Sequence, residues 1–342
     1  MGERIAETRA DVQTDMDLFK ATLPFGVESL KTSWWVVAST FLLLFASLLG
    51  AALAPAWPVR LLFSLVSALL LVRAFITYHD YMHKAILSQS RIAAWLFRLF
   101  AVLALTPPGY WRHSHNFHHG HVGKLDAAAT GAFTMMTTDM WREASFVERI
   151  AYRAERHPLT IVAGYVTIFL FSITLLPLIR NPARYWDSLL VLAGHVALIA
   201  GLWVWGGFDA AFFVILLPVT IASMIGSYLF FAQHSFEHIQ MLPTETWTSR
   251  RAALESSSYM KLNPVMRWIT GNIGYHHIHH LNVRIPFYRL PEAMDAIEGL
   301  QSPVTITLSW KDIRACFRCC LWDEGLQRMV TYREFARASA AA

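Results

Sequence analysis

Apolar runs close in length to the thickness of a bilayer constrain this chain more than any other feature. A helix needs roughly 20 mainly apolar residues to cross the hydrocarbon core, and lipid offers no partner to an unpaired backbone amide. Hydrophobic residues make up 55% of the 342-residue chain and charged residues only 15%, against about a quarter in soluble proteins. These features predict an all-α integral membrane protein. The runs are 34–54, 61–76, 159–179, 188–205 and 210–231.

Histidines cluster after several of these runs. If all of them build one site, they must lie on the same side of the membrane, and this condition restricts the topology. If all three of the later runs crossed the membrane, the histidines after residue 231 would face the side opposite to the earlier ones. We therefore expect 159–179 to be a re-entrant or interfacial hairpin, which leaves about four transmembrane helices. Arg180 and Arg184 follow this run, whereas the loop 206–209 carries no Lys or Arg. The positive-inside rule then places the 180–187 loop in the cytosol.

A further apolar stretch, 92–105, is short, contains Arg98 and ends before Pro107. Its length and its charge predict a second interfacial segment rather than a span. Around the spans we predict three regions: a cytosolic lead-in at 1–32, a membrane domain with a cytosolic helical cap at 33–300, and a cytosolic tail at 301–342.

The net charge and the chain ends narrow the class of protein further. A formal charge of +5 favours anionic headgroups or an acidic redox partner, and no interleaving of basic and aromatic residues indicates nucleic-acid binding. The N-terminal stretch has no early apolar core, so we expect no cleavable signal peptide. The three cysteines fall within residues 316–320 and are expected to be reduced thiols on a cytosolic segment.

Ten of the fifteen histidines form four clusters at the ends of apolar segments. Their spacings of three and four residues place the members of each cluster on one face of a helix. Neutral imidazole is a common ligand of transition metals. The clusters are His79 and His83; His115, His118 and His119; His234 and His238; and His276, His279 and His280.

The number of imidazoles indicates two metal ions rather than one. The eight histidines of the clusters that begin at His79, His115 and His276, together with His234, supply nine nitrogens, or four to five for each of two metals, whereas one zinc would use three or four. His238, one turn from His234 on a helix, would be a tenth ligand. His277 points away from the shared face of its motif and is expected to hydrogen-bond near the ligands instead.

The motifs resemble those of the membrane fatty acid desaturase family. The family pattern of one HDxxH and two HxxHH boxes matches His79–His83, His115–His119 and His276–His280, written here as HDYMH, HNFHH and HHIHH. The stretches QHSFE at 233–237 and GNIGY at 271–275 are similar to its acyl-lipid, omega-6 or delta-12 branch. The resemblance covers roughly residues 78–290.

This resemblance implies a di-iron centre held by the box histidines on the cytosolic side of the membrane, which is the inner membrane if the source is bacterial. It also implies molecular oxygen as co-substrate, a lipid-linked acyl chain as substrate, and electrons from a separate donor such as ferredoxin or cytochrome b5. The product would carry a new cis double bond. The protein would hold the metals and steer one methylene towards them from an apolar tunnel.

Several polar residues near the motifs are candidates for orienting the ligand imidazoles. Asp80, Asp126 and Glu237 are such carboxylates, although each also fits a solvated or helix-capping acid. His195 lies inside an apolar run, where an ionisable residue suggests function, but a hydrogen-bonded structural role is the favoured interpretation.

Two other functions fit the same residues. A di-iron hydroxylase or ketolase acting on a lipid, an alkane or a carotenoid would use the same histidine boxes. A non-catalytic metal-binding or metal-transporting membrane protein is the third possibility, but transporters place their ligands inside the spans rather than at the ends.

Overall fold

The computed structural model describes residues 15–125 and 133–341, and apolar helices form its largest part. Two of these, α2 (Leu30–Leu53) and α3 (Trp57–Met82), form a hairpin of 24 and 26 residues. Both are long and apolar enough to cross a membrane. The pair is held by packing and by small polar groups, since the hydroxyl of Ser67 donates to that of Ser47 at 2.8 Å. Interhelical hydrogen bonds of this kind suit helices whose surroundings are as apolar as their own side chains.

A third apolar unit, 46 residues long, runs from Asp187 to Ala232. It comprises α10 (Asp187–Ala211), the π-helical η3 (Phe212–Leu216) and α11 (Leu217–Ala232). The backbone leaves helical geometry at Gly206 and Gly207, and Gly207 has a φ of +68° that favours glycine. This break lies where the sequence predicts a loop.

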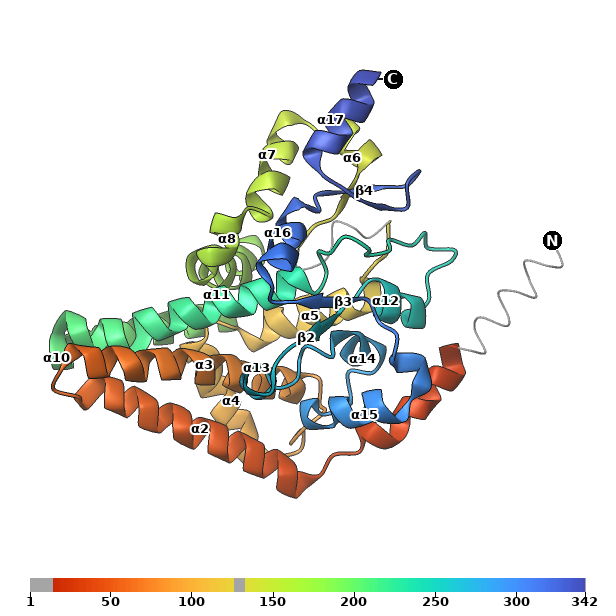
Figure 1. The fold of residues 1–342 in the computed structure, drawn as a ribbon. Helices are drawn as coiled ribbons and strands as arrows, with labels where there is room; N and C mark the ends of the chain where they lie inside the picture. The colour runs from red at the N-terminus through yellow and green to blue at the C-terminus, as the bar shows by residue number, and fades with distance from the viewer. Residues whose placement is uncertain (1–14, 126–132, 342) are drawn as a thin grey trace.

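The two ends of this unit return to the same short helix, α5 (Pro108–His121). At one end Asp187 accepts a hydrogen bond from the amide of Gly109, and at the other His234 lies 3.1 Å from His118. Residues 109 and 118 are separated by about 14 Å along a helix, whereas a straight helix of this length would span about 69 Å. The unit is therefore an antiparallel pair of helices (Figure 1).

The two shorter apolar stretches do not form straight spans. The helix α4 (Arg91–Leu103) bends by 91° into α5, as expected where Pro107 and Pro108 remove backbone donors. The run 159–179 becomes α8 (Pro158–Val162), the π-helical η2 (Tyr165–Leu175) and α9 (Leu176–Arg180). This segment packs on α11 at Gly164, on α3 at Phe169 and beside α4 at Thr174, so it crosses the long helices. Neither run forms one straight spanning helix, and their placement in the interface stays a prediction.

A cap covers one end of the bundle, and it is mostly helical (Figure 1). Its helices are η1 (Leu23–Gly26), α6 (Thr138–Glu143), α7 (Phe146–Glu155), α12 (Ser249–Glu255), α13 (Pro264–Ile269), α14 (His276–Leu281), η4 (Phe287–Arg289), α15 (Leu290–Ala296), η5 (Glu298–Leu300), α16 (Trp310–Arg318) and α17 (Tyr332–Ala341).

Two small sheets in the cap were not expected from the sequence. One has the order β1 (Met136–Thr137), β4 (Leu321–Asp323), β5 (Arg328–Val330), and the other pairs β2 (Tyr259–Lys261) with β3 (Thr305–Thr307). Met136 pairs in parallel with Leu321, which pairs antiparallel with Val330. Strands of two or three residues are too short to show the alternation that identifies a strand in a sequence. Through β3 and β4, the segment 301–342 packs into the cap.

The cap segment that carries α14 is docked on α3 by one arginine and one glycine. Arg73 is buried in α3, donates to the backbone oxygen of Trp268, and lies 4.2 Å from the centre of its ring. Gly271 has a φ of +51°, and a Cβ there would meet Ile76 of α3 at 2.8 Å. The backbone of this segment therefore lies directly against α3.

Replacing Gly271 by alanine should loosen this contact. We expect Gly271→Ala to lower the unfolding free energy by about 1–3 kcal/mol, because alanine in the left-handed region is strained and its methyl group overlaps Ile76. The apparent melting temperature of the detergent-solubilised protein would measure this. Gly201→Ala, where a Cβ meets nothing within 4 Å, is the matched control and should be neutral or slightly stabilising. Equal melting of both variants would contradict the prediction.

Candidate metal centre

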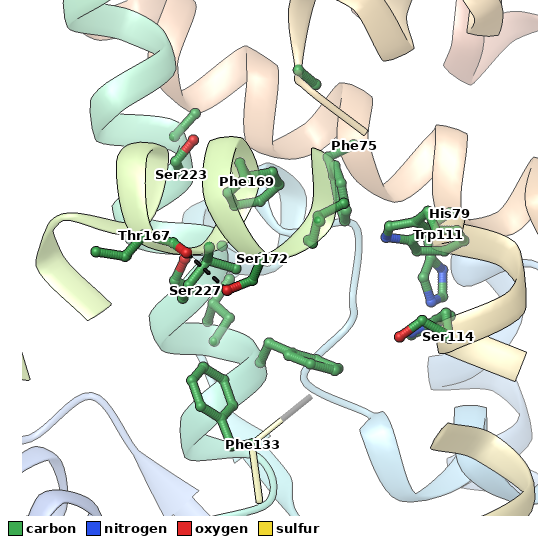
Figure 2. A pocket seen from close by; sticks show the side chains of 18 of the residues that line it. Phe75, His79, Trp111, Ser114, Phe133, Thr167, Phe169, Ser172, Ser223 and Ser227 are labelled. Carbon is green, nitrogen blue, oxygen red and sulfur yellow. Dashed lines mark hydrogen bonds between the residues drawn. The ribbon is translucent and has the colours of Figure 1, made fainter. Parts of the chain in front are cut away.

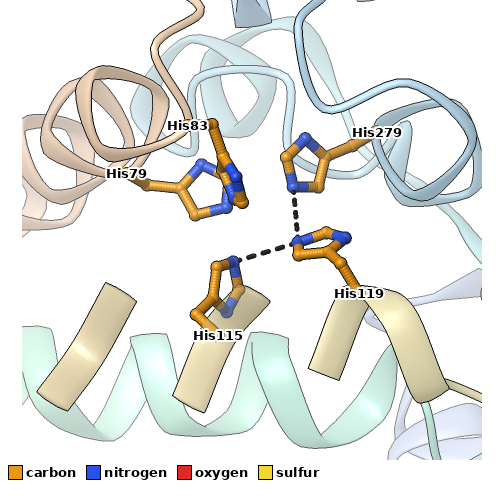
Figure 3. A group of neighbouring side chains, drawn as sticks. All are labelled: His79, His83, His115, His119 and His279. Atoms are coloured by element: carbon orange, nitrogen blue, oxygen red, sulfur yellow. Dashed lines mark hydrogen bonds between the residues drawn. The ribbon is translucent and has the colours of Figure 1, made fainter. Parts of the chain in front are cut away.

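Nine of the ten clustered histidines converge beneath the bundle, although they come from four separate segments. The end of α3 supplies His79 and His83, α5 and α14 supply three each, and His234 follows α11. Within each of two groups the nearest ring nitrogens lie within 4.8 Å of one another. The first group is His79, His83, His115, His119 and His279 (Figure 3), and the second is His118, His234, His276 and His280.

In the first group the rings point towards a common centre (Figure 3). The Nε2 atom of His119 lies 3.1 Å from that of His115 and 3.1 Å from that of His279. The rings of His79 and His83 close the other side, with centroids 4.6 Å apart. The Nε2 atom of His83 is buried and has no hydrogen-bond partner within the described part of the chain.

The second group is arranged in the same way around His234 and His276. The Nε2 atom of His234 lies 3.1 Å from that of His118 and 2.9 Å from that of His276, and His276 is 3.1 Å from His280. The Nδ1 atom of His234 lies 3.0 Å from the carbonyl oxygen of Ser256. A carbonyl only accepts, so Nδ1 carries the proton and Nε2 presents a lone pair to its neighbours.

These distances test whether the groups fit metal ions. Two nitrogens at right angles around a metal, each about 2.1 Å from it, are about 3.0 Å apart. The observed separations of 2.9–3.1 Å agree with that value. Within the described residues neither group includes a carboxylate or a thiolate, and an all-imidazole set suits transition metals rather than Mg²⁺ or Ca²⁺. The residues present therefore fit metal ions.

The two groups adjoin, so two metal positions would be neighbours. The ring of His119, from the first group, lies 4.2 Å from that of His280, from the second. His118 and His119 are consecutive on α5, and His279 and His280 are consecutive on α14. Each of these two helices therefore contributes to both groups.

Burial keeps the imidazoles neutral, which is the form that binds a metal. Desolvation holds the pKa values of His276, His279 and His280 well below the usual value, and neighbouring histidines lower them further. The same cause lowers the pKa of His234 to about 4, although its bond to Ser256 opposes the shift. At neutral pH the lone pairs of these residues are available to a cation.

Two of the predicted orienting residues lie close to the groups. One carboxylate oxygen of Asp80 is 3.0 Å from Nδ1 of His79, and the other accepts the amide of Phe287 at 2.7 Å. His277 is buried and points away from the groups, as predicted, but its partner is the carbonyl oxygen of Leu300 at 3.2 Å. His277 thus ties α14 to η5 rather than to a ligand.

The structure does not bring His238 or Glu237 to the groups, which corrects the sequence-based set. Both side chains are exposed, and His238 belongs to neither group. The expected i, i+4 relation with His234 assumed a helix, but α11 ends at Ala232, before either histidine. The third candidate carboxylate, Asp126, lies outside the described residues.

His195 has the structural role that was favoured. Its Nδ1 atom lies 3.0 Å from the carbonyl oxygen of Val102, and its Nε2 atom lies 2.7 Å from the hydroxyl of Tyr165. It therefore links α10 to α4 and η2.

Residues outside the predicted set of ligands and orienting residues hold the third motif in place. Gln233 is buried and donates to the carbonyl oxygen of Ile273 at 3.1 Å, which joins the end of α11 to the segment before α14. Arg73 docks the same segment from the other side. The sequence contains a signal for the role of Arg73, which is the only charged residue in the apolar run 61–76. It contains no signal for the contact between the carbonyl of Ser256 and His234.

A cavity of about 840 Å³ opens onto the histidines. His79 from the first group and His118 and His276 from the second line one end of it, beside Trp111, whose ring stacks on His115 at 4.4 Å. Apolar side chains of α3, η2 and α11 line much of the remainder, with hydroxyl groups among them (Figure 2). Both histidine groups thus face one largely apolar cavity.

Fold and site together define a class of helical membrane protein with a paired histidine centre next to an apolar cavity. The chain belongs to the fatty acid desaturase family, whose model matches residues 55–307. It is an oxidoreductase of that family, as the sequence motifs predicted.

Curated relatives agree with this assignment. A protein of Bacillus subtilis (strain 168) named fatty acid desaturase is 33% identical over 320 residues, which covers 92% of this chain and 90% of that protein. The sn-1 oleoyl-lipid 12-desaturase of Synechocystis is 24% identical over 74% of this chain and 73% of its own. A ferredoxin-dependent sn-1 acyl-lipid omega-3 desaturase of Synechocystis is 24% identical over 73% of this chain and 70% of its own.

A pair of alanine variants tests the corrected set of ligands. We expect His234→Ala to lower the amount of iron bound per chain, because it removes a central nitrogen of the second group, whereas His238→Ala should bind as much as the wild type. Elemental analysis of protein reconstituted with ferrous iron measures this. Equal loss in the two variants would contradict the geometric assignment.

Proposed function

We propose that this protein is a membrane di-iron desaturase that introduces a cis double bond into a lipid-linked acyl chain. It would use molecular oxygen and two electrons from a separate donor such as ferredoxin or cytochrome b5. The observation that carries the proposal is the pair of adjoining imidazole groups at the end of an apolar cavity. The proposed ligands are the nine histidines of these groups.

The balance of the reaction explains why iron is the proposed metal. Two adjacent methylenes lose two hydrogen atoms, and oxygen takes these with two further electrons and two protons to form two waters. Iron would supply the redox chemistry for breaking unactivated C–H bonds, which zinc cannot do because it has no redox activity. The protein has to hold the acyl chain, orient the ligands and exclude water.

Residues of this chain are suited to each of these tasks. Asp80 fixes the ring orientation of His79 through Nδ1, so that Nε2 faces the group. Trp111 covers His115 by stacking, and its position in the cavity wall shields the histidines from solvent. Phe75 and Phe169, with ring centroids 6.1 Å apart, provide apolar surface for an acyl chain close to His79.

The names of the relatives support the finer parts of the proposal. Two of them act on sn-1 acyl lipids by name, and one name gives ferredoxin as donor. By analogy, we propose an acyl lipid as substrate and a ferredoxin-like protein as the first donor to test.

For the topology, we propose four membrane passes, made by α2, α3, α10 and η3 with α11. The histidine groups would then face the cytosol, at the inner membrane if the source is bacterial. We keep the division into 1–32, 33–300 and 301–342, with the last region contributing β3 and β4 to the cap.

Lipid analysis tests the function directly. We expect expression with a matching donor, in a host without polyunsaturated lipids, to give fatty-acid methyl esters two hydrogens lighter than their precursors. His276→Ala should abolish them, because this residue contacts two other nitrogens of its group. Mass spectrometry measures the product. A gain of oxygen would indicate the hydroxylase alternative, and an unchanged profile with a functional donor would contradict both.

Narrowing the cavity should weaken binding of long acyl chains. Gly226 of α11 lines the cavity, and a Cβ there would lie 4.0 Å from the ring of Phe169. We expect Gly226→Leu to raise KM by about tenfold, since filling a packed site costs about 1–3 kcal/mol. Iron content should not change. Gly201→Leu, which faces open space, is the control, and the same KM effect there would contradict the assignment of the cavity.

A further inference from the structure

The helix α7 has an apolar face that no described residue covers. Phe146 and Val147 are 78% and 73% exposed, and Ile150, Ala151 and Ala154 are exposed as well. At about 100° per residue these five side chains occupy an arc of roughly 140°. We call this arc the α7 face. It carries no charged residue, and Arg153 and Glu155 border it on either side.

The opposite face of α7 is covered by the small lobe of β4, β5 and α17. The hydroxyl of Tyr152 donates to the carbonyl oxygen of Cys320, and the guanidinium of Arg153 lies 4.7 Å from the ring centre of Tyr332. Arg149 donates to the backbone of Trp141 at 2.9 Å. Figure 1 shows α7 running across the direction of the long helices, with α6 and β4 on one side of it. The uncovered face is directed away from this lobe.

The α7 face continues into the apolar surface of the membrane segment. Three residues after the end of α7, the chain enters α8, where Leu159 and Val162 are also exposed, and then η2, where Val166 is exposed. Leu159 and Val162 directly precede η2, and Val166 belongs to η2, which packs across the long apolar helices. Exposed apolar side chains therefore recur from η2 through α8 to α7, with the exposed His157 between α8 and α7, and this recurrence indicates one apolar medium along these segments.

The same junction forms part of the cavity wall. Ala154 and Glu155 at the end of α7 and Thr160 of α8 line the cavity, together with Val166 and Thr167 of η2. The end of the α7 face therefore lies at the edge of the site that receives the substrate.

We propose that the α7 face inserts into the interfacial region of the bilayer, so that α7 is an in-plane anchor that holds the edge of the cavity at the lipid surface. An apolar face bordered by charged side chains is characteristic of helices that lie in this region. An acyl chain would then pass from the leaflet into the cavity beside α7 and α8 without crossing water. This consequence for substrate entry rests on the proposed function, whereas the insertion does not.

Continuity with η2 favours lipid over the other possible occupants of the face. A second copy of the chain would have to bind at a surface that runs into the membrane segment. A soluble electron donor is recognised mainly through charge, and the α7 face has none. Both occupants remain distinguishable by experiment.

Site-directed spin labelling can locate the face with little interference from native thiols. Cys316, Cys319 and Cys320 are buried, and burial raises the pKa of the Cys316 and Cys319 thiols to about 12, which suppresses their labelling at neutral pH. A nitroxide at Val147→Cys would report on the α7 face. A nitroxide at Arg337→Cys, an exposed position on α17, is the matched control.

The full-length labelled proteins would be placed in vesicles of phosphatidylcholine and phosphatidylglycerol. Collisions with oxygen, which concentrates in lipid, would be compared with collisions with a water-soluble nickel chelate. We expect an oxygen-to-nickel ratio about tenfold higher at Val147→Cys than at the control, since such helices lie roughly 5–10 Å into the headgroup and acyl boundary. Phe146→Ser in the same labelled chain should lower the ratio.

Three outcomes would overturn the proposal. Equal ratios at the two positions would place α7 in water. Protection of Val147→Cys from both reagents would place it against protein, and dipolar coupling between labels would identify that protein as a second copy. Failure of the proposed function is a separate observation. A chain that inserts α7 but forms no double bond would still show the high oxygen-to-nickel ratio at Val147→Cys.

Discussion

The rest of the structure depends on nine imidazole rings that direct ring nitrogens at one another in a buried region. Lone pairs about 3 Å apart repel, and a buried nitrogen without a partner loses the hydrogen bond it had in water. His234 cannot relieve this by donating from Nε2, because its proton is on Nδ1, against Ser256. A cation within each group removes the conflict for all members at once. The helical scaffold can therefore be understood as the means of holding these rings together.

That scaffold joins segments far apart in the sequence through a few buried polar contacts. Asp80 connects α3 to the backbone of Phe287, and Gln233 connects the end of α11 to Ile273. Arg73 extends the connection to Trp268 from within an apolar helix. Each contact satisfies a backbone group that would otherwise be buried without a partner. Each also joins two segments that carry or adjoin a histidine motif, and thereby fixes the position of that motif.

Much of this could be predicted from the sequence, because the signals are local. Apolar run lengths identified the long helices, and spacings of three and four residues identified the histidines that share a helix face. The prediction for His238 was wrong because a spacing of four residues places two side chains on one face only within a helix. The helix α11 ends at Ala232, before both His234 and His238. The strands β1 to β5 were missed because each has only two or three residues, and because β1 and β2 pair with segments far along the chain. The Ser256 carbonyl was missed because backbone contacts leave no residue pattern.

The helix η2 is as hydrophobic as a span, although it packs across the long helices of the bundle instead of running along them. Phe169 of η2 faces α3 and the cavity, and Val166 also lines the cavity although its side chain is 55% exposed. A helix between an apolar cavity and lipid needs apolar residues on both sides, so its composition equals that of a span. Its position also forms a wall of the cavity next to the histidines. Hydropathy alone cannot separate these two cases, and the proposed topology rests on the condition that all histidine motifs have to lie on one side of the membrane.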